Sequence, residues 1–255
     1  MNKPIIAVQL YTLREQMRTV EQIRESLHKV RAIGYTSVQI SGIGPIDPHL
    51  LKEFLEQEQL TVCATHNSWQ RLQEDLDAVI FEHQLWGCKY VGLGAMPGHY
   101  QGSRDGWSQF ARDASTIGRK LRDHGLQFIY HNHAFEFQKF DGVTGLEILM
   151  TESDPDAFHF ELDTYWIQVG GANPVTWIEK AAGRMRVVHF KDMGNAGKNE
   201  PVMAEVGEGN LEWPQIIEAC CRIGVEYAAV EQDYCQRDPF ESLAISWRNL
   251  KRMGL

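Results

Sequence analysis

The sequence predicts an α/β fold, a single (β/α)8 TIM barrel formed by residues 1–255. Short runs of β-forming residues alternate about eight times with longer amphipathic segments, as expected for repeated βα units around a parallel sheet. The length of 255 residues suits one such barrel. Three segments also share one junction, in which a helical pattern ends at a glycine and a strand follows; the glycines are Gly34, Gly125 and Gly224.

The predicted elements follow one another along the whole chain. The strands cover residues 5–11, 37–40, 61–66, 90–93, 127–131, 158–162, 186–189 and 227–231. The helices cover residues 20–33, 48–58, 71–86, 107–122, 143–151, 174–181, 213–221 and 239–253. The loop at 194–209 is long and contains several glycines. Because it follows the seventh strand, we expect it to lie over the barrel mouth as a lid.

Composition and charge favour a protein that acts on small molecules. A net charge of −9 and a pI of about 5.6 disfavour nucleic-acid binding, which needs clustered Lys and Arg. No apolar run approaches the roughly 20 residues needed to cross a bilayer, and no secretory leader is visible. The five cysteines form no C-x-x-C pair. We expect a cytoplasmic protein without nucleic-acid or membrane partners; the sequence leaves a homo-oligomer open.

Four predicted strands end in side chains that bind metals or transfer protons. They belong to the runs at 128–133, 158–163, 187–192 and 229–233. Because the carboxyl ends of barrel strands open on one face, we expect these side chains to converge there. Histidine and carboxylate ligands together suit Mn²⁺, Co²⁺, Zn²⁺ or Fe²⁺. The sequence therefore predicts a site for a divalent transition metal at the barrel mouth.

Each candidate also has a structural alternative. His189 could be a hydrogen-bonded histidine of the barrel interior, and Asp163 could cap the turn that follows it. Glu231 could form a salt bridge with Lys191. The histidines of the predicted helices are expected to lie at the surface; they are His28, His83 and His124. The joint occurrence of acids and histidines at successive strand ends favours the metal site over these alternatives.

The strand-end motifs resemble those of the sugar phosphate isomerase/epimerase family, in order along the whole chain. They are Gln9-Leu-Tyr-Thr-Leu-Arg14, Tyr130-His-Asn-His-Ala-Phe-Glu-Phe137, Leu162-Asp-Thr-Tyr-Trp166, His189-Phe-Lys-Asp-Met193, Val206-Gly-Glu-Gly209 and Val230-Glu-Gln-Asp233. These xylose isomerase-like TIM barrels include inosose dehydratase, ketose 3-epimerases and endonuclease IV. The resemblance does not fix the substrate.

The resemblance implies a divalent metal held by a glutamate, an aspartate, a histidine and a second glutamate after strands five to eight. Asp163, His189 and Glu231 match the last three. His131 stands where many members have the first glutamate, although His133 or Glu136 could replace it as the fourth ligand. Mn²⁺ is the metal expected from the resemblance, with Co²⁺, Zn²⁺, Fe²⁺ and Mg²⁺ as alternatives.

The resemblance further implies an isomerase or epimerase that acts on a sugar, keto-sugar or inositol derivative through an enediolate. We expect Glu231 or His131 to act as the base and Lys191 to hold the enediolate. Because the first glutamate is missing, the alternative is a lyase or dehydratase of an inosose-like ketone or a 3-keto-glycoside; a non-catalytic sugar binder is less favoured. The expected substrate contacts are Gln9, His66, His133, Glu136, Trp166 and Glu208.

Overall fold

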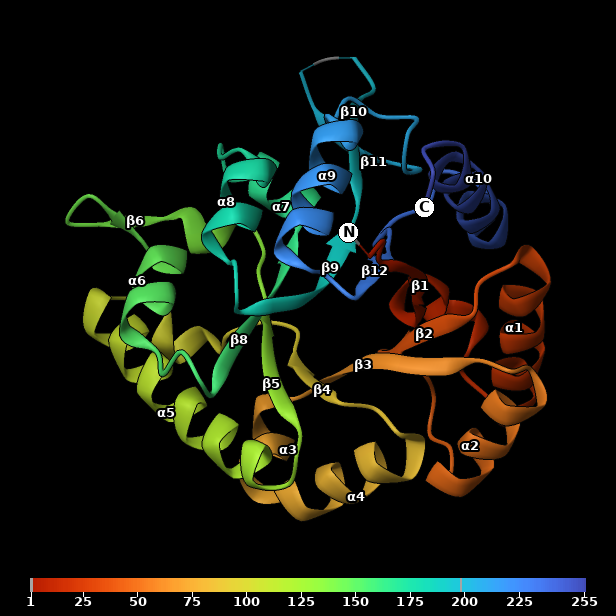
Figure 1. Ribbon diagram of the computed structural model, residues 1–255, viewed down its shortest axis with the longest axis horizontal. Coiled ribbons are helices and arrows are strands. Elements are labelled where there is room, and N and C mark those ends of the chain that lie inside the picture. The colour runs from red at the N-terminus through yellow and green to blue at the C-terminus, as the bar shows by residue number, and fades with distance from the viewer. Residues whose placement is uncertain (1, 198) are drawn as a thin grey trace.

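The computed structural model describes residues 2–197 and 199–255, and its parallel strands form a closed barrel surrounded by helices (Figure 1). The predicted fold is confirmed. Neighbouring strands around the barrel are β1 (Ile5–Gln9), β2 (Ser37–Ile40), β3 (Thr61–Asn67), β4 (Tyr90–Leu93), β5 (Gln127–His131), β8 (Phe158–Asp163), β9 (Met185–Phe190) and β12 (Tyr227–Val230), which returns to β1.

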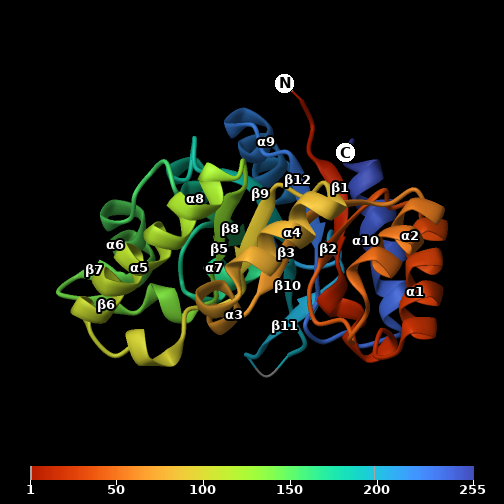
Figure 2. The ribbon, with the colours of Figure 1, turned by 90° about the horizontal axis from the view of Figure 1, so that it is seen from below.

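The helices pack outside the barrel, with α1, α2 and α10 on one side and α5, α6 and α8 on the other (Figure 2). They are α1 (Val20–Ile33), α2 (Pro48–Gln57), α3 (Trp69–Glu74), α4 (Leu76–Trp86), α5 (Arg104–Asp123), α6 (Gly145–Glu152), α7 (Thr164–Val169), α8 (Pro174–Lys180), α9 (Trp213–Ile223) and α10 (Pro239–Arg252). In the described part of the chain, no helix combines the length and the apolar character needed to cross a membrane.

Local sequence explains the boundaries of α1. A capping box at its start pairs the Thr19 side chain with the backbone of Gln22, and the Gln22 side chain with the backbone of Thr19. Gly34 ends the helix with φ of 122°, and a Cβ atom there would lie 2.5 Å from the Trp247 ring. A glycine is therefore required both by the backbone angle and by the close approach of α10.

Several element boundaries differ from the predictions. β1 ends at Gln9, because the chain turns into a 3₁₀ helix (Leu10–Gln16) whose first turn the Gln9 side chain caps. The helix predicted at 71–86 is two helices, α3 and α4, interrupted at Asp75 with φ of −137°. α5 begins before residue 107, since the Ser103 side chain accepts a hydrogen bond from Gly106 N. Sequence analysis did not identify α7.

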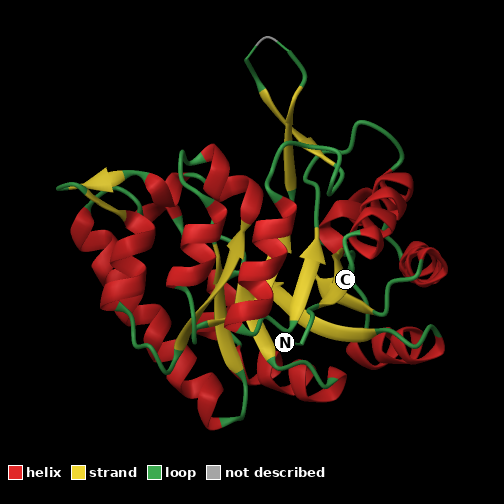
Figure 3. Cartoon of the chain, turned by 45° about the horizontal axis from the view of Figure 1, so that its top comes forward, coloured by secondary structure: helices red, strands yellow, loops and turns green. Residues whose placement is uncertain are grey.

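Two short antiparallel hairpins extend from the barrel. One pairs β6 (Lys139–Phe140) with β7 (Val143–Thr144), at the start of the segment that was predicted to be helical. The other pairs β10 (Asp192–Asn195) with β11 (Pro201–Ala204), within the segment predicted to be a loop. Figure 3 shows this second hairpin projecting from the barrel. Its function as a lid stays a prediction.

The interior of the barrel has an apolar layer below a polar one. Its apolar residues form a separate buried cluster of Ala7, Cys63, Ala64, Tyr90, Ile129, Val187 and Ala229. Side chains alternate along a strand, so the residues two positions further on also point inward. In β5, β9 and β12 these are His131, His189 and, just past the end of the strand, Glu231. The fold thus places the candidate ligands above a closed apolar base.

Candidate active site

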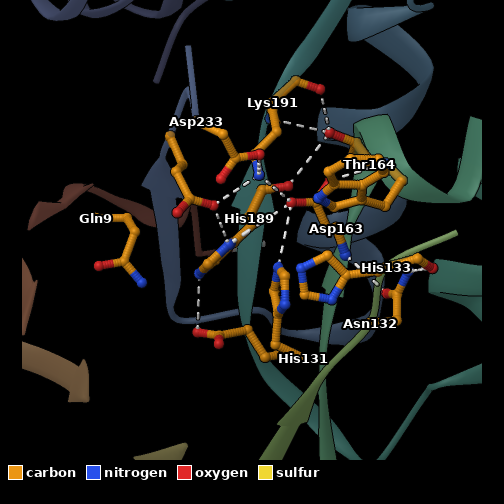
Figure 4. A network of polar contacts seen from close by, with 12 residues as sticks. Gln9, His131, Asn132, His133, Asp163, Thr164, His189, Lys191 and Asp233 are labelled. Atoms are coloured by element: carbon orange, nitrogen blue, oxygen red, sulfur yellow. Dashed lines mark hydrogen bonds and ion pairs between the residues drawn. The ribbon is translucent and has the colours of Figure 1, made fainter. Parts of the chain in front are cut away.

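Four of the predicted residues converge at the carboxyl end of the barrel. His131, Asp163, His189 and Glu231 are all buried, and each offers one ligand atom within 4.8 Å of the others. The labelled side chains His131, Asp163 and His189 point toward one another in Figure 4. His131 Nε2 lies 3.3 Å from Asp163 Oδ2, and His189 Nδ1 lies 3.0 Å from Glu231 Oε2. The cluster could hold a metal ion.

The second polar atom of three cluster residues is fixed by a partner outside the cluster. His131 Nδ1 donates to Gly94 O at 3.0 Å, which leaves Nε2 as the inward-facing nitrogen. His189 Nε2 donates to Gln39 Oε1 at 2.9 Å, which leaves Nδ1 inward. Asp163 Oδ1 accepts from Trp166 N at 2.9 Å as the cap of α7, which leaves Oδ2 inward. Metal-binding side chains typically have such outer partners.

Lys191 supplies a fixed positive charge beside the cluster. Its Nζ lies 3.1 Å from Asp163 Oδ2, 2.8 Å from Glu231 Oε2 and 3.0 Å from Asp233 Oδ2. Burial alone would lower the pKa of Lys191, but these three carboxylates raise it above its usual range. Lys191 therefore stays a buried ammonium group that faces three carboxylates beside the cluster.

The charges within the cluster shift each other's pKa values. Burial raises the pKa of the Asp163 carboxyl, yet Lys191 and the adjacent histidines together hold it well below its usual range. Burial also opposes ionisation of Glu231, but Lys191 and His189 lower its pKa. Both groups are consequently carboxylates at neutral pH. Two carboxylates and two imidazoles are a donor set that suits Mn²⁺, Fe²⁺, Co²⁺ or Zn²⁺, so the residues present fit such an ion.

A cavity of about 360 Å³ opens next to the cluster. Its lining includes His131, Glu231 and two predicted substrate contacts, His66 and His133. This volume is within the range of small-molecule sites. The rest of the wall comes mainly from segments after β1 to β4, namely Tyr11, Ser41, Asn67, Ser68, Trp69, Leu93, Gly94 and Ala95, together with Asp233.

Two further predicted contacts, Gln9 and Trp166, lie beside residues of this cavity or the cluster. Gln9 Nε2 is 3.5 Å from His66 Nδ1. His133 packs against Trp166, and its Nδ1 is buried without a hydrogen-bond partner among the described residues. Burial lowers the pKa of His133 to about 3, so the ring is neutral. Trp166 also lies over Lys191, with Nζ 5.5 Å from the ring centroid.

The structure places Glu136 and Glu208 outside the ligand cluster. Glu136 is buried; it accepts hydrogen bonds from Tyr130 Oη at 2.7 Å and from His133 N at 2.8 Å. Burial raises its pKa to about 8, so it holds the loop after β5 as a largely neutral acid. Glu208 is exposed and accepts from Asn249 Nδ2 of α10 at 2.8 Å. Neither lines the cavity.

Sequence analysis missed Glu161, a fully buried carboxylate of β8. It faces inward with Asp163 because the two are separated by one residue on the same strand. Burial raises its pKa, but His189 and His66 together hold the pKa well below the usual range. The signal was present in the run Phe158-His-Phe-Glu-Leu-Asp163, where an acid interrupts an apolar strand at the position that shares its face with Asp163.

His83 was also misplaced, since it was expected at the surface. It is buried, with Nδ1 2.6 Å from Val79 O and Nε2 2.8 Å from Thr65 Oγ1 of β3. Burial lowers its pKa to about 4. Helical spacing explains the error, because His83 follows Val79 by one turn on the face of α4 that packs against the barrel.

Comparison with known proteins identifies the family. Residues 27–239 match the model of the xylose isomerase-like TIM barrel. The chain belongs to this family. It is 24% identical over 257 residues to an inosose dehydratase of Lacticaseibacillus casei, with 85% of each chain covered.

Solved structures share the fold. One is a sugar phosphate isomerase/epimerase from Parabacteroides distasonis, with a TM-score of 0.80, 21% identity and 98% of each chain covered. Another is a probable 3-DHS dehydratase involved in petrobactin synthesis in Bacillus anthracis, with a TM-score of 0.74, 14% identity, and 97% of this chain and 98% of that chain covered.

Proposed function

We propose that this protein is a divalent-metal-dependent lyase that removes water from a polyhydroxylated cyclic ketone of the inosose class. The observation that carries the proposal is the cluster of His131, Asp163, His189 and Glu231 beside a cavity, with one ligand atom of each within 4.8 Å of the others. The similarity to inosose dehydratases over 85% of the chain supports the substrate class. Mn²⁺ is the metal we expect from the donor set and the family, with Co²⁺, Zn²⁺, Fe²⁺ and Mg²⁺ as alternatives.

The four ligands and the lysine have separate functions in this proposal. A divalent metal bound there would act as a Lewis acid on a ketone and an adjacent hydroxyl. Glu231 lines the cavity and takes the proton from the carbon next to the ketone. The electron pair of the broken C–H bond moves toward the ketone oxygen, where the Lys191 ammonium stabilises the negative charge. When that pair returns to form the carbon–carbon double bond, the bond between the β-carbon and its hydroxyl breaks. The leaving hydroxyl takes from Glu231 the proton that was removed from the α-carbon, and it departs as water.

The identity of residue 131 favours elimination over epimerisation. In an epimerase, a base on one face of the sugar removes the proton and an acid on the opposite face returns it to carbon. Here β5 presents His131, whose Nε2 faces Asp163 at 3.3 Å, instead of a carboxylate. His131 serves as a ligand in this proposal, so it has no free lone pair for a proton. Among the four proposed ligands, Glu231 is then the only carboxylate that lines the cavity, and one base is enough for elimination.

A keto-sugar isomerase or epimerase is the second candidate. It is favoured by the similarity in fold to the Parabacteroides distasonis isomerase/epimerase over 98% of both chains. Both candidates share the first step, because each requires removal of a proton next to a carbonyl group. They differ only in whether carbon regains a proton or loses a hydroxyl.

Incubation in D₂O distinguishes the candidates. The Mn²⁺-loaded protein is mixed with inososes and with keto-sugars, and products are followed by ultraviolet absorbance and mass spectrometry. We expect an absorbing enone and loss of one water from an inosose. Deuterium gained at the α-carbon without loss of water would favour the isomerase. Neither change across both panels would contradict the proposed function.

A further inference from the structure

Glu161 is a buried carboxylate that the proposed mechanism does not use. Its Oε2 lies 2.6 Å from His66 Nε2 and 3.1 Å from Gln39 Nε2, and its Oε1 lies 3.4 Å from His189 Nε2. No lysine or arginine of the described residues forms an ion pair with it. Burying a carboxylate is costly unless partners compensate for the lost water. The neighbours of Glu161 should therefore indicate what this carboxylate does.

A second metal site is one explanation, because His66, Glu161 and His189 also offer donor atoms within 4.8 Å of one another. The nitrogens of His189 argue against it. Its Nδ1 faces Asp163 and Glu231, and its Nε2 lies 2.9 Å from the acceptor Oε1 of Gln39. A neutral histidine that binds a metal through Nδ1 has its proton on Nε2 and cannot bind a second ion there. His66 and Glu161 alone are too few ligands.

The hydrogen bond to His66 has a clear direction. Glu161 accepts, so the proton of a neutral His66 ring lies on Nε2 and the lone pair lies on Nδ1. His66 lines the cavity, and the Gln9 side-chain nitrogen lies 3.5 Å from Nδ1.

Two glycines leave room for the His66 ring. A Cβ atom on Gly92 would lie 2.8 Å from His66 Cδ2 and 2.2 Å from Thr65 O. A Cβ atom on Gly94 would lie 3.1 Å from His66 Nδ1. The first glycine gives the ring its space, and the second leaves Nδ1 accessible. The space around the ring and the access to Nδ1 both suit a nitrogen that accepts a hydrogen bond from a bound ligand.

We propose that Glu161 is a positioning residue that fixes His66 with its proton on Nε2, so that His66 Nδ1 accepts a hydrogen bond from a hydroxyl group of the substrate. The inference rests on the proposed function, which supplies a polyhydroxylated ligand. A site built to bond a hydroxyl discriminates strongly against the analogue that lacks it. His66 is thus a specificity-determining residue, and Glu161 acts through it.

The tautomer can be measured without turnover. Long-range ¹H–¹⁵N correlation spectra of the zinc-loaded, ¹⁵N-labelled protein identify which ring nitrogen has the proton, and the His66→Gln variant assigns the signal. We expect the Nε2–H form in the unmodified protein and a mixture of tautomers in Glu161→Met, which has no acceptor at this position. Glu161→Gln, which keeps a neutral acceptor, provides a second variant if Glu161→Met does not fold. An Nδ1–H form in the unmodified protein would overturn the proposal.

Kinetics and metal content complete the test. For an inosose, we expect Glu161→Met and Gly94→Ala each to raise KM about tenfold. In Gly94→Ala the added methyl group obstructs His66 Nδ1, while the tautomer of the ring stays unchanged. For the monodeoxy inosose that lacks the bonded hydroxyl, KM should not change in either variant. Equal effects on all analogues would overturn the proposal.

Metal analysis distinguishes the positioning function of Glu161 from the alternative of a second metal site. Two metal ions per chain, reduced to one in Glu161→Met, would establish the second metal site and overturn the positioning function. The tautomer and the metal content are both measured without substrate. Failure of inososes to react would therefore count against the proposed function alone, whereas a wrong tautomer would count against the positioning of His66 alone.

Discussion

The two halves of the barrel mouth differ in charge. The half formed by β5, β8, β9 and β12 supplies the candidate ligands and the ammonium group: His131, Asp163, His189, Lys191 and Glu231. The half formed by β1 to β4 supplies amides, a neutral imidazole and a glycine at the interior: Gln9, Gln39, His66 and Gly92. The comparison indicates that the two halves have different functions. One half can bind a cation, and the other orients the groups that surround it.

The largest expected effect is on the charged half. Asp163→Asn should remove the bound metal and reduce turnover by about 10⁴-fold or more, because an amide replaces an anionic ligand that has no substitute. Elemental analysis and the enone assay measure the two effects. Asp105→Asn, an exposed change on α5, is the matched control. Full metal content in Asp163→Asn would refute the ligand assignment and remove the distinction between the halves.

The charged half should also lose stability as pH rises from mildly acidic to neutral and slightly above. Glu136 has a folded-state pKa raised to about 8, so the folded protein binds the extra proton and the free energy of unfolding falls as pH rises from 4.5 to 8. The shift corresponds to at most about 5 kcal/mol. We expect Glu136→Gln to flatten this part of the pH profile in urea unfolding. An unchanged slope would show that Glu136 is ionised in the fold.

The neutral half should lose stability in acid instead. Burial lowers the pKa of His83, behind β3, to about 4 from an ordinary 6.5. Between these values the unfolded chain binds more protons, so stability declines as pH falls from 6.5 to 4, by about 3 kcal/mol. His83→Gln should reduce this decline in urea unfolding, and the exposed His28→Gln serves as the control. Equal slopes in both variants would count against the assignment.

The smallest effect should come from an outer partner of the proposed metal site. Gln39→Met removes the acceptor for His189 Nε2 at similar side-chain volume. Outer partners of metal-binding histidines typically contribute about 10–100-fold to metal affinity or activity. We expect weaker Mn²⁺ binding by that factor in competition with a chelator, while the folded content stays unchanged. Loss of all metal would place Gln39 among the ligands and weaken the comparison of the two halves.

The sequence was most informative where a repeating pattern has one physical cause. The alternation of strand and helix patterns predicted the barrel, because each βα unit must bury its apolar face in the same way. The convergence of His131, Asp163, His189 and Glu231 was predictable, since parallel strands end on a common face. Resemblance then supplied the ligand set, which periodicity alone left open.

The missed features depend on partners far away in the chain. Glu161 is stabilised by His66, which lies 95 positions earlier, so its own strand gives no sign of compensation. His83 is likewise satisfied by Thr65 of a neighbouring element. The break at Asp75 between α3 and α4 occurs at neither a proline nor a glycine. Single-sequence patterns do not contain such tertiary information.

The buried Asp192 joins the loop at residues 207–211 and the start of α9 to the segment that follows β9. Its carboxylate accepts hydrogen bonds from the backbone nitrogens of Met193, Gly207, Gly209 and Leu211 and from Trp213 Nε1. Opening this side of the mouth would break several of these bonds at once. The cavity wall instead comes mainly from the segments after β1 to β4. A ligand should therefore enter and leave the candidate site over those loops.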